Sequence, residues 1–453
     1  GPPPPARACR TPSAGVPQRG RLASVLRSGL TGVTLVLDEP TLGLHARDVD
    51  GLVVLLRGYR DRGNTVVVVE HAPRVLRAAD HLVELGPRAG AEGGRIVDAG
   101  APLDVLAGDG PTAMALRTAP PPSHRPPSDA RLVLRGCRAH HLKGIDVDLP
   151  LSGVVAVTGV SGSGKSSLLF DVLEASVRAQ RPVECDAIEV DGGPERFKDV
   201  RTTRWITGAT TVLTALDGMA AMQKLFHAEA KGTGLARSAF SFASPAGRCP
   251  ACGGTGRERV AMDFMADLEL VCSVCEGRRY RDEVLAVIWN GMNVAESLER
   301  PVSDLVPLLP KGKLRAAFEA LERVGLGALT PGRRTHDLSG GEVQRVTLAA
   351  SLAASASPTL HLYDEPATGL HEADVARLAD VLHALADRGD LVVVAEHRLS
   401  LIARADHVVD LGPESGASGG TVVDSGAPAQ LTRGATAREL ARRPAVARMA
   451  DGA

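Results

Sequence analysis

The chain has 453 residues, enough for roughly two to four domains, with 44% hydrophobic and 23% charged residues. Because 52 basic residues balance 53 acidic ones, any nucleic-acid binding has to come from a local basic patch. An aromatic content of 3% argues against a protein that binds single strands by base stacking. No membrane span or signal peptide stands out, so no membrane association is expected and the default location is cytoplasmic.

Two proline-rich stretches lie at either end of the first part of the chain. Residues 1–15 are too rich in proline, and too poor in apolar periodicity, to form an ordered element. Thr118–Asp129 is predicted to be a linker for the same reason.

The segments between these stretches recur later in the chain. Asp38 and Asp364 lie 326 positions apart, and the same offset relates His71 to His397, so the copies align without a gap. The chain therefore carries two copies of one domain's C-terminal half. The matching pairs are Leu35–Asp48 with His361–Asp374, Thr65–His71 with Leu391–His397, and Ala79–Pro102 with Ala405–Pro428.

A nucleotide-binding motif lies between the two copies, in Val154–Phe170. The β-branched run Val154–Val157 predicts a buried strand, and the apolar periodicity of Leu168–Val177 predicts a helix. The turn between them fits G-x-x-x-x-G-K-[ST], whose backbone N–H groups close around phosphates at a helix N-terminus. Within it, Lys165 is expected to reach the β and γ phosphates of ATP and Ser166 to bind Mg²⁺. The predicted ATP-binding residues of this loop are Gly159, Gly162, Gly164, Lys165, Ser166 and Ser167.

Four cysteines form two C-x-x-C pairs in Arg248–Arg281. Their spacing fits a tetrahedral zinc site that closes a β-hairpin, and a cytosolic chain disfavours the alternative of disulfides. Six arginines on or beside this module suit contacts to a phosphate backbone, although a solvated charged surface explains them about as well. The predicted zinc ligands are Cys249, Cys252, Cys272 and Cys275, and the arginines are Arg248, Arg257, Arg259, Arg278, Arg279 and Arg281.

Two further elements complete the predicted site. In Leu338–Arg345 (LSGGEVQR), Ser339, Gly340 and Gly341 open a helix whose free N–H groups can bind a phosphate from the opposite side. At the end of the strand Leu360–Glu365, Asp364 is expected to hold Mg²⁺ and Glu365 to activate the attacking water. A lone Asp-Glu would more often be a solvated turn, but the repeat and the P-loop favour catalysis. His397, after the next strand, is placed to sense the γ phosphate, so Lys165, Glu365 and His397 are the predicted catalytic residues.

The P-loop, LSGGE-x-Q, Asp-Glu-Pro and Glu-His, in this order, resemble an ATP-binding-cassette (ABC) ATPase. TGVSGSGKSSL and DEPATGLH are similar to the UvrA family, the damage-recognition subunits of the bacterial excision nuclease, and the Cys₄ module resembles the zinc module of that family's second half. The resemblance covers most of residues 13–430. It implies an α/β fold of P-loop ABC cassettes, one complete and one N-terminally truncated, with an inserted zinc-binding signature domain.

The resemblance also assigns domain boundaries. The expected division is a remnant at 1–12, the C-terminal half of a first cassette at 13–117, the linker at 118–129, the P-loop lobe of a second cassette at 130–190, a signature and insertion domain at 191–335 with its zinc module at 249–275, the C-terminal half of the second cassette at 336–435, and a tail at 436–453.

The sequence departs from the family pattern in three places. The first copy shows no P-loop, zinc site or partner-binding insertion. Its signature is degraded, because PSAGVPQR at Pro12–Arg19 stands where LSGGEVQR is expected, with Ala14 in place of a glycine. Gly192 stands where the family has a glutamine. A shortened or divergent member is therefore expected, with weak ATP hydrolysis.

Four functions remain open at this point. The first is a UvrA-like ATPase that binds duplex DNA for damage recognition in nucleotide excision repair, acting with ATP, Mg²⁺ and Zn²⁺ as a homodimer; recruitment of a UvrB-like partner stays open. The second is a paralogue that protects DNA from bound drugs. The third is the ATPase of an exporter, against which the Cys₄ module speaks. The fourth is an inactive fragment, which the start at Gly1 keeps open.

Overall fold

The computed structural model describes residues 31–41, 44–87, 93–117, 128–202, 210–260, 268–354 and 358–448. It divides into two compact units, one of Gly1–Thr203 with Ala356–Ala453 and one of Arg204–Ser355. The degraded signature at Ser13–Arg19, with Ala14, lies outside the described residues.

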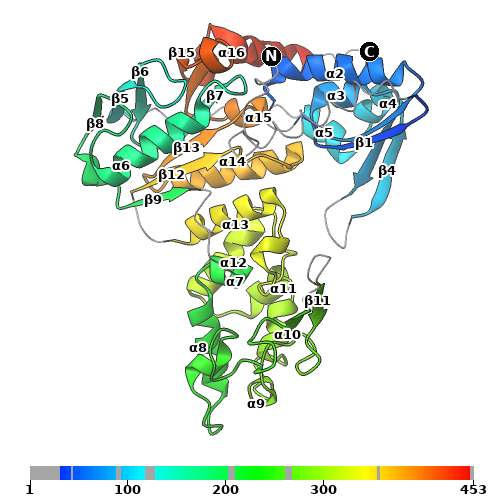
Figure 1. The fold of residues 1–453 in the computed structure, drawn as a ribbon, viewed down its shortest axis with the longest axis vertical. Coiled ribbons are helices and arrows are strands. Elements are labelled where there is room, and N and C mark those ends of the chain that lie inside the picture. The colour runs from blue at the N-terminus through cyan, green and yellow to red at the C-terminus, as the bar shows by residue number, and fades with distance from the viewer. Residues whose placement is uncertain are drawn as a thin grey trace. The chain divides into compact units, whose positions relative to one another are not determined.

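A six-stranded sheet forms the centre of the first unit (Figure 1). Its middle strand, β7 (Gly153–Gly159), pairs in parallel with a neighbour on each side, and all seven of its residues are buried. A parallel strand covered on both faces reads as a continuous apolar run, which explains the sequence VVAV. The sheet runs in the order β15 (Thr421–Gly426), β14 (His407–Gly412), β7, β13 (Leu391–Ala395), β12 (Thr359–Asp364) and β9 (Asp199–Thr202).

Helices and a second sheet, made of the strands at residues 145–150, 131–137 and 187–190, cover the two faces of the central sheet. Alternate residues of β13, such as Val393, join one hydrophobic core with Leu169 of the helix that follows the P-loop, while α14 (Glu372–Ala386) packs on β13 and β7. Figure 1 shows α6 and α14 beside the strands. The remaining elements here are β5 (Arg131–Cys137), β6 (Ile145–Pro150), the π-helical η2 (Ser167–Glu174), α6 (Ala175–Ala179), β8 (Ala187–Val190), η3 (Pro194–Arg196), α15 (Leu399–Ile402), η8 (Gly416–Ser418), η9 (Pro428–Gln430) and α16 (Gly434–Arg448).

The first copy repeats this fold in part. Thr34 pairs with Thr65 as Leu360 pairs with Leu391, and the register irregularity after Glu84 has its counterpart after Asp410. The gap-free sequence repeat is therefore a structural repeat. Its elements are β1 (Thr34–Asp38), α2 (Ala46–Arg60), β2 (Thr65–Val69), α3 (Pro73–Ala78), β3 (Leu82–Gly86), β4 (Arg95–Gly100), α4 (Pro102–Ala107) and α5 (Pro111–Arg117).

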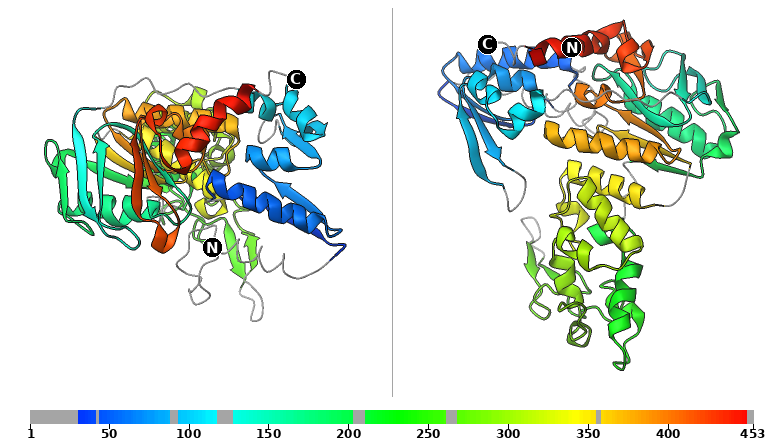
Figure 2. Two further views of the ribbon diagram at one scale, coloured as in Figure 1. Left: turned by 90° about the horizontal axis from the view of Figure 1, so that it is seen from above. Right: turned by 180° about the vertical axis from the view of Figure 1, so that it is seen from behind.

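The two copies pack on each other by reciprocal contacts. Helix α2 of the first copy contacts α16, and α14, which is the counterpart of α2, contacts α5. Equivalent histidines contribute on both sides: His45 Nε2 lies 3.4 Å from Thr436 Oγ1, and His371 Nε2 lies 3.0 Å from Thr112 Oγ1. The equivalent helices α2 and α14 thus each contact a helix near the end of the other copy; Figure 2 draws α2 in blue and α14 in orange.

The second unit is mostly helical around an aromatic core. Phe226 stacks on Phe240 and meets the edge of Trp289, each with ring centroids 6.0 Å apart. Its elements are α7 (Val212–Ala215), α8 (Met219–Glu229), η5 (Arg237–Phe240), the hairpin β10 (Arg257–Val260) and β11 (Leu268–Val271), α9 (Asp282–Leu285), α10 (Val294–Glu299), α11 (Val302–Leu305), η6 (Val306–Leu308), α12 (Lys313–Arg323), η7 (Thr335–Asp337) and α13 (Gly340–Ala353).

The division between the units differs from the expected insertion at 191–335. Strand β9 pairs with β12, so Asp199–Thr202 belongs to the central sheet rather than to the insertion. Helix α13, which opens at the signature, packs on α12 and so belongs to the second unit. Among the described residues, no helix is long and apolar enough to cross a membrane.

A buried ionic network ties β12 to the turn before β13. Asp390 accepts hydrogen bonds from Thr359 N at 2.9 Å and Arg388 Nη2 at 2.9 Å, and its Oδ2 lies 3.2 Å from His361 Nε2. Burial by itself raises the pKa of Asp390, but the hydrogen bonds from His361 and Arg388 outweigh it and lower the pKa to about 2. The charged form is therefore favoured by folding.

We expect Asp390→Asn to lower the free energy of unfolding by about 2 kcal/mol at pH 7, because a group whose pKa is depressed on folding stabilises the fold above its unfolded pKa. The stabilisation is lost as pH falls from about 4 towards 2, so the difference from the parent should shrink at pH 3. Denaturant unfolding of both proteins at pH 7 and at pH 3 measures this difference in the free energy of unfolding. Asp109→Asn is the control, since the Asp109 side chain is fully exposed. An equal loss at both pH values would contradict the ionic explanation.

Candidate functional site

The phosphate-binding loop follows β7 at the carboxyl edge of the central sheet. Gly159, Gly162 and Gly164 have φ of +134°, +80° and +105°, a region that side chains disfavour. A Cβ on Gly159 would lie 1.9 Å from the carbonyl oxygen of Leu411, and one on Gly164 would lie 2.7 Å from Leu142 Cδ2. Glycine is therefore favoured at both ends of the loop by backbone conformation, and at Gly159 also by space, because the close atom there belongs to the backbone.

The Lys165 side chain is buried inside the loop. Its Nζ donates to the carbonyl oxygens of Gly159 at 2.9 Å and Val160 at 3.2 Å. Burial lowers the pKa of Lys165, and the nearby carboxylates of Glu365 and Asp364 oppose that shift. An ammonium group enclosed by a loop of backbone N–H groups suits a polyanion such as a nucleotide triphosphate.

Ser166 and Asp364 meet although they are 198 residues apart in sequence. Ser166 Oγ donates to Asp364 Oδ2 at 2.9 Å, because β7 and β12 end at the same edge of the sheet. A hydroxyl beside a carboxylate offers the oxygen ligands that Mg²⁺ prefers. Ser167 opens η2 directly behind them.

Glu365 and His397 also lie at this edge. Glu365 takes φ +49°, and its N–H donates to Ala395 O at 2.8 Å, so the residue turns off the end of β12. His397 Nδ1 lies 3.7 Å from Glu365 Oε1. Burial and then the charge of Lys165 lower the pKa of His397 to about 3, so its imidazole is neutral. Within the described part of the chain this buried Nδ1 has no hydrogen-bond partner, which leaves it available to a ligand.

A buried carboxylate that the sequence reasoning missed supports these groups. Glu396 accepts backbone hydrogen bonds from His397 at 2.8 Å, Arg398 at 2.9 Å and Ala367 at 3.3 Å. It thereby joins the turn after Asp364-Glu365 to the turn that carries His397. The available signal was the repeat itself, because Glu396 has a counterpart in Glu70.

The first copy holds the same arrangement. Glu39 takes φ +43° and donates from its N–H to Val69 O at 2.9 Å, as Glu365 does to Ala395. Glu70 accepts from the N–H groups of Thr41, His71 and Ala72 at 2.9, 2.8 and 2.9 Å. Burial, followed by the charges of Asp38 and Glu70, raises the pKa of Glu39. The structure thus contains two similar groups of carboxylates with a histidine, one in each copy, and the group in the second copy lies beside the P-loop.

The signature residues lie in the second unit. Ser339 is the N-cap of α13, where its Oγ accepts from Glu342 N at 3.3 Å and Glu342 Oε2 accepts from Ser339 N at 2.8 Å. Gly340, which is exposed, and Gly341, which is partly buried, form the first turn, and a Cβ on Gly340 would meet nothing within 4 Å. The N–H groups of this turn therefore suit an anion. Gly192, at the position of the family's glutamine, lies in the turn after β8 with φ +86°.

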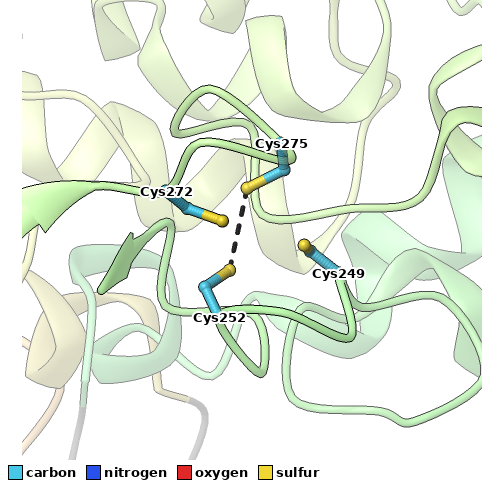
Figure 3. A group of neighbouring side chains, drawn as sticks. All are labelled: Cys249, Cys252, Cys272 and Cys275. Atoms are coloured by element: carbon cyan, nitrogen blue, oxygen red, sulfur yellow. Dashed lines mark hydrogen bonds between the residues drawn. The ribbon is translucent and has the colours of Figure 1, made fainter. Parts of the chain in front are cut away.

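The four cysteines converge at the base of the β10–β11 hairpin (Figure 3). Their Sγ atoms all lie within 4.8 Å of one another, and Cys252 Sγ lies 3.7 Å from Cys275 Sγ. Backbone donors approach the cluster as they do around thiolates, with Gly256 N 3.3 Å from Cys252 Sγ. Four sulfurs from two C-x-x-C turns are the donor set of a structural zinc site, so the residues fit that ion. Cys137 is buried and Cys185 partly buried, both outside the cluster.

The arginines of this module differ in how they are held. Arg279 is only 13% exposed: its guanidinium lies 5.5 Å over the Phe242 ring and donates to Gly332 O at 2.9 Å. Arg278 and Arg281 are exposed, and Arg278 pairs with Glu276 at 3.2 Å. The expectation that Arg279 belongs to an exposed basic surface is therefore wrong, because its side chain packs inward.

A groove of about 640 Å³ lies beside the hairpin in the second unit. Its charge is mixed, since both arginines and carboxylates line it. The charged lining residues are Arg257, Arg278, Arg279, Arg333, Arg334, Glu276, Glu296, Glu299 and Asp337.

Known proteins resemble this chain in sequence and in structure. The chain is similar to UvrABC system protein A of Staphylococcus aureus (strain COL), with 42% identity over 446 residues that cover 94% of this chain and 47% of that protein. It is similar in structure to UvrA2 of Deinococcus radiodurans, with TM-score 0.88, 37% identity, and coverage of 96% of this chain and 55% of that one. A model of ribosome-bound archaeal Pelota and ABCE1 matches in fold alone, with TM-score 0.53, 17% identity, and coverage of 93% and 57%. The chain spans about half the length of the curated relatives it matches. A scan of protein-family models finds no match.

We expect the purified chain to contain about one zinc ion, and Cys249→Ser or Cys272→Ser to abolish its retention, because three thiolates no longer close the tetrahedron. Hydrogen exchange should quicken in β10 and β11 and stay unchanged in β7 and β13, which belong to the other unit. Metal analysis and hydrogen exchange measure the two effects. Cys185→Ser is the matched control. A fully folded parent without zinc would contradict the assignment.

Proposed function

The chain belongs to the UvrA family, of whose members it spans about half, and we propose that it acts as an ATP-dependent DNA-binding protein in nucleotide excision repair. The observation that carries the proposal is the convergence of a P-loop, Asp364-Glu365 and His397 at one sheet edge, in a chain 42% identical to a UvrABC system protein A.

ATP hydrolysis is assigned to this edge. Lys165 would bind the β and γ phosphates, and Ser166 with Asp364 would hold Mg²⁺, which supplies charge neutralisation when bound. Glu365 would accept a proton from the attacking water. The neutral imidazole of His397, 3.7 Å from Glu365, would orient that water or contact the terminal phosphate. Positioning carries most of phosphoryl-transfer catalysis, so the Glu396 hydrogen bonds that fix this turn support the rate indirectly.

The signature at Ser339–Gly341 would bind a nucleotide held by a different P-loop. In ABC ATPases each nucleotide lies between the P-loop of one cassette and the signature of another. Gly159–Ser166 is the P-loop that the sequence shows, so we propose that two chains pair and that each P-loop meets the partner's intact signature. The rate of ATP hydrolysis per chain should then rise with protein concentration. This pairing does not depend on recruitment of a UvrB-like protein.

DNA binding is assigned to the exposed arginines around the zinc hairpin. Arg257, Arg278 and Arg281 are exposed on or next to a rigid Cys₄ module, where contacts to phosphates give binding with little sequence preference and a steep salt dependence. The net charge of −1 supplies no attraction from the whole chain. Duplex DNA is the proposed ligand.

The first prediction from this proposal concerns pairing. Lys165→Ala and Ser339→Ala chains should each hydrolyse ATP at least ~100-fold more slowly than the parent, because each lacks a phosphate contact. An equal mixture should recover about a quarter of the parental rate, since half of the dimers are mixed and each holds one intact site. A coupled assay of phosphate release measures both.

Ser303→Ala is the matched control for loss of an exposed serine hydroxyl in the second unit. A Ser339→Ala chain that is as active as the parent would contradict pairing in trans and leave hydrolysis within one chain.

The second prediction concerns DNA. The Arg278→Ala, Arg281→Ala double variant should weaken duplex binding and reduce the slope of log K against log salt by up to about 2, one unit for each lost phosphate contact. Arg279→Ala should instead lower the melting temperature, because it removes a buried cation–π contact and a hydrogen bond to Gly332.

Fluorescence anisotropy of a labelled duplex across a salt series measures the slope. Arg323→Ala, an exposed arginine on α12, is the control. An unchanged slope in the double variant would place the DNA surface elsewhere.

A further inference from the structure

One arginine in the second unit holds two carboxylates that come from different elements. Arg334 donates from Nε and Nη2 to the two carboxylate oxygens of Asp337, at 2.9 and 3.1 Å, and from Nη1 to Glu269 Oε2 at 2.7 Å. Glu269 belongs to β11 of the hairpin, and Asp337 ends η7, two residues before Ser339. We name Glu269, Arg334 and Asp337 the Arg334 clamp.

The geometry of the clamp differs from that of an ordinary surface ion pair. A single exposed pair adds little to stability, because water screens it and two flexible side chains must be fixed. Arg334 is only 21% exposed and binds Asp337 through two parallel N–H groups, which fixes the orientation of both side chains. Its hydrogen bonds lower the pKa of Glu269 and of Asp337, so both carboxylates stay charged at neutral pH.

The main chain around Arg334 is held independently of the clamp. Thr211 pairs with Arg334 in an antiparallel bridge, and the N–H of Val212 donates to Arg333 O at 2.9 Å. The Arg334 side chain can therefore be removed without releasing the segment that carries it. An effect of its removal then reports on the clamp.

The clamp continues a row of alternating charges that begins on the proposed DNA surface. Arg257, one of the exposed arginines assigned to duplex DNA, has its Nη1 3.8 Å from Glu269 Oε2. The charges alternate from Arg257 through Glu269 and Arg334 to Asp337. A phosphate bound to Arg257 competes with Glu269 for that arginine, and this changes the balance of charge at Arg334.

The last member of the row lies beside the signature. Ser339 opens α13, whose first-turn N–H groups suit an anion. A carboxylate near that helix end repels a phosphate, and a cation held against the carboxylate reduces the repulsion. Because Arg334 binds both oxygens of Asp337, the clamp sets the charge and the orientation of this carboxylate.

We propose that Arg334 is a positioning residue that couples the β10–β11 hairpin to the signature. Glu269 ties Arg334 to the hairpin, and Asp337 ties it to the turn before Ser339, so that a ligand on the hairpin alters how the signature accepts a phosphate. The identity of those two ligands, duplex DNA and a nucleotide, rests on the proposed function. The coupling itself does not require them.

The test measures hydrogen exchange of residues 335–342 in the full chain without ligands. Glu269→Gln should quicken it about threefold, the size expected for one partly exposed ion pair, and Arg334→Ala about tenfold, because three hydrogen bonds are lost. The double variant should be no faster than Arg334→Ala, since Glu269 acts through Arg334. Glu276→Gln is the matched control from the same module, because its partner is Arg278, and it should leave this exchange unchanged.

Two results of this cycle would overturn the proposal. Effects that multiply to about thirtyfold in the double variant would mean that the two residues act independently. Equal quickening in α8, which belongs to the aromatic core of the same unit, would mean that Arg334 only stabilises the unit as a whole. Unchanged exchange in Glu269→Gln would show that the hairpin is not coupled to the signature turn.

A labelled duplex supplies the second measurement. Saturating duplex should change the exchange of residues 335–342 in the parent at least about twofold, and this response should vanish in Arg334→Ala while the Kd from anisotropy stays within about twofold. A parent that binds duplex without the response, or a response that persists in Arg334→Ala, would overturn the coupling. A parent that binds no duplex would contradict the proposed function instead, and exchange without ligands would still decide the fate of the clamp.

Discussion

The pairing of β7 with β13 and β14 is the constraint on which the site depends. Parallel strands end at one edge, so a strand inserted between two others brings its following loop next to theirs. This places Lys165 and Ser166 within reach of Asp364, Glu365 and His397, which come from two other strands. The proposed nucleotide site is a consequence of strand order, and the glycines of the loop allow the backbone to take the conformation that this site needs.

The internal repeat provides a comparison that isolates the effect of that strand. Where β7 and η2 are present, both faces of β12 and β13 are buried; in the first copy the equivalent strands β1 and β2 are partly buried on one face and exposed on the other. The Glu70 and Glu396 hydrogen bonds are nonetheless the same in both copies. The geometry of the Asp-Glu and Glu-His turns is therefore local to the repeated half and does not require the P-loop beside it.

The Cys₄ module shows how far function can be predicted from residue type alone. The spacing of Cys249, Cys252, Cys272 and Cys275 predicts a cluster, and the structure brings the four sulfurs together. Six arginines on or beside the module suit contacts to phosphates, yet Arg279 turns inward onto Phe242 and Gly332. Cysteines in two C-x-x-C turns converge because each turn is short, whereas the direction of a long arginine side chain depends on its distant neighbours.

The sequence by itself determined the P-loop, the Cys₄ spacing, the Asp-Glu pairs and the offset that relates the two copies, because the motifs lie in short contiguous segments and the offset follows from aligning such segments with one another. Only the tertiary structure decided which unit holds α13 and β9, which arginines are exposed, that Glu396 joins two turns, and that one face of the first copy is open. All four depend on contacts between residues far apart in the chain, and a motif records which residues are present without recording what packs against them.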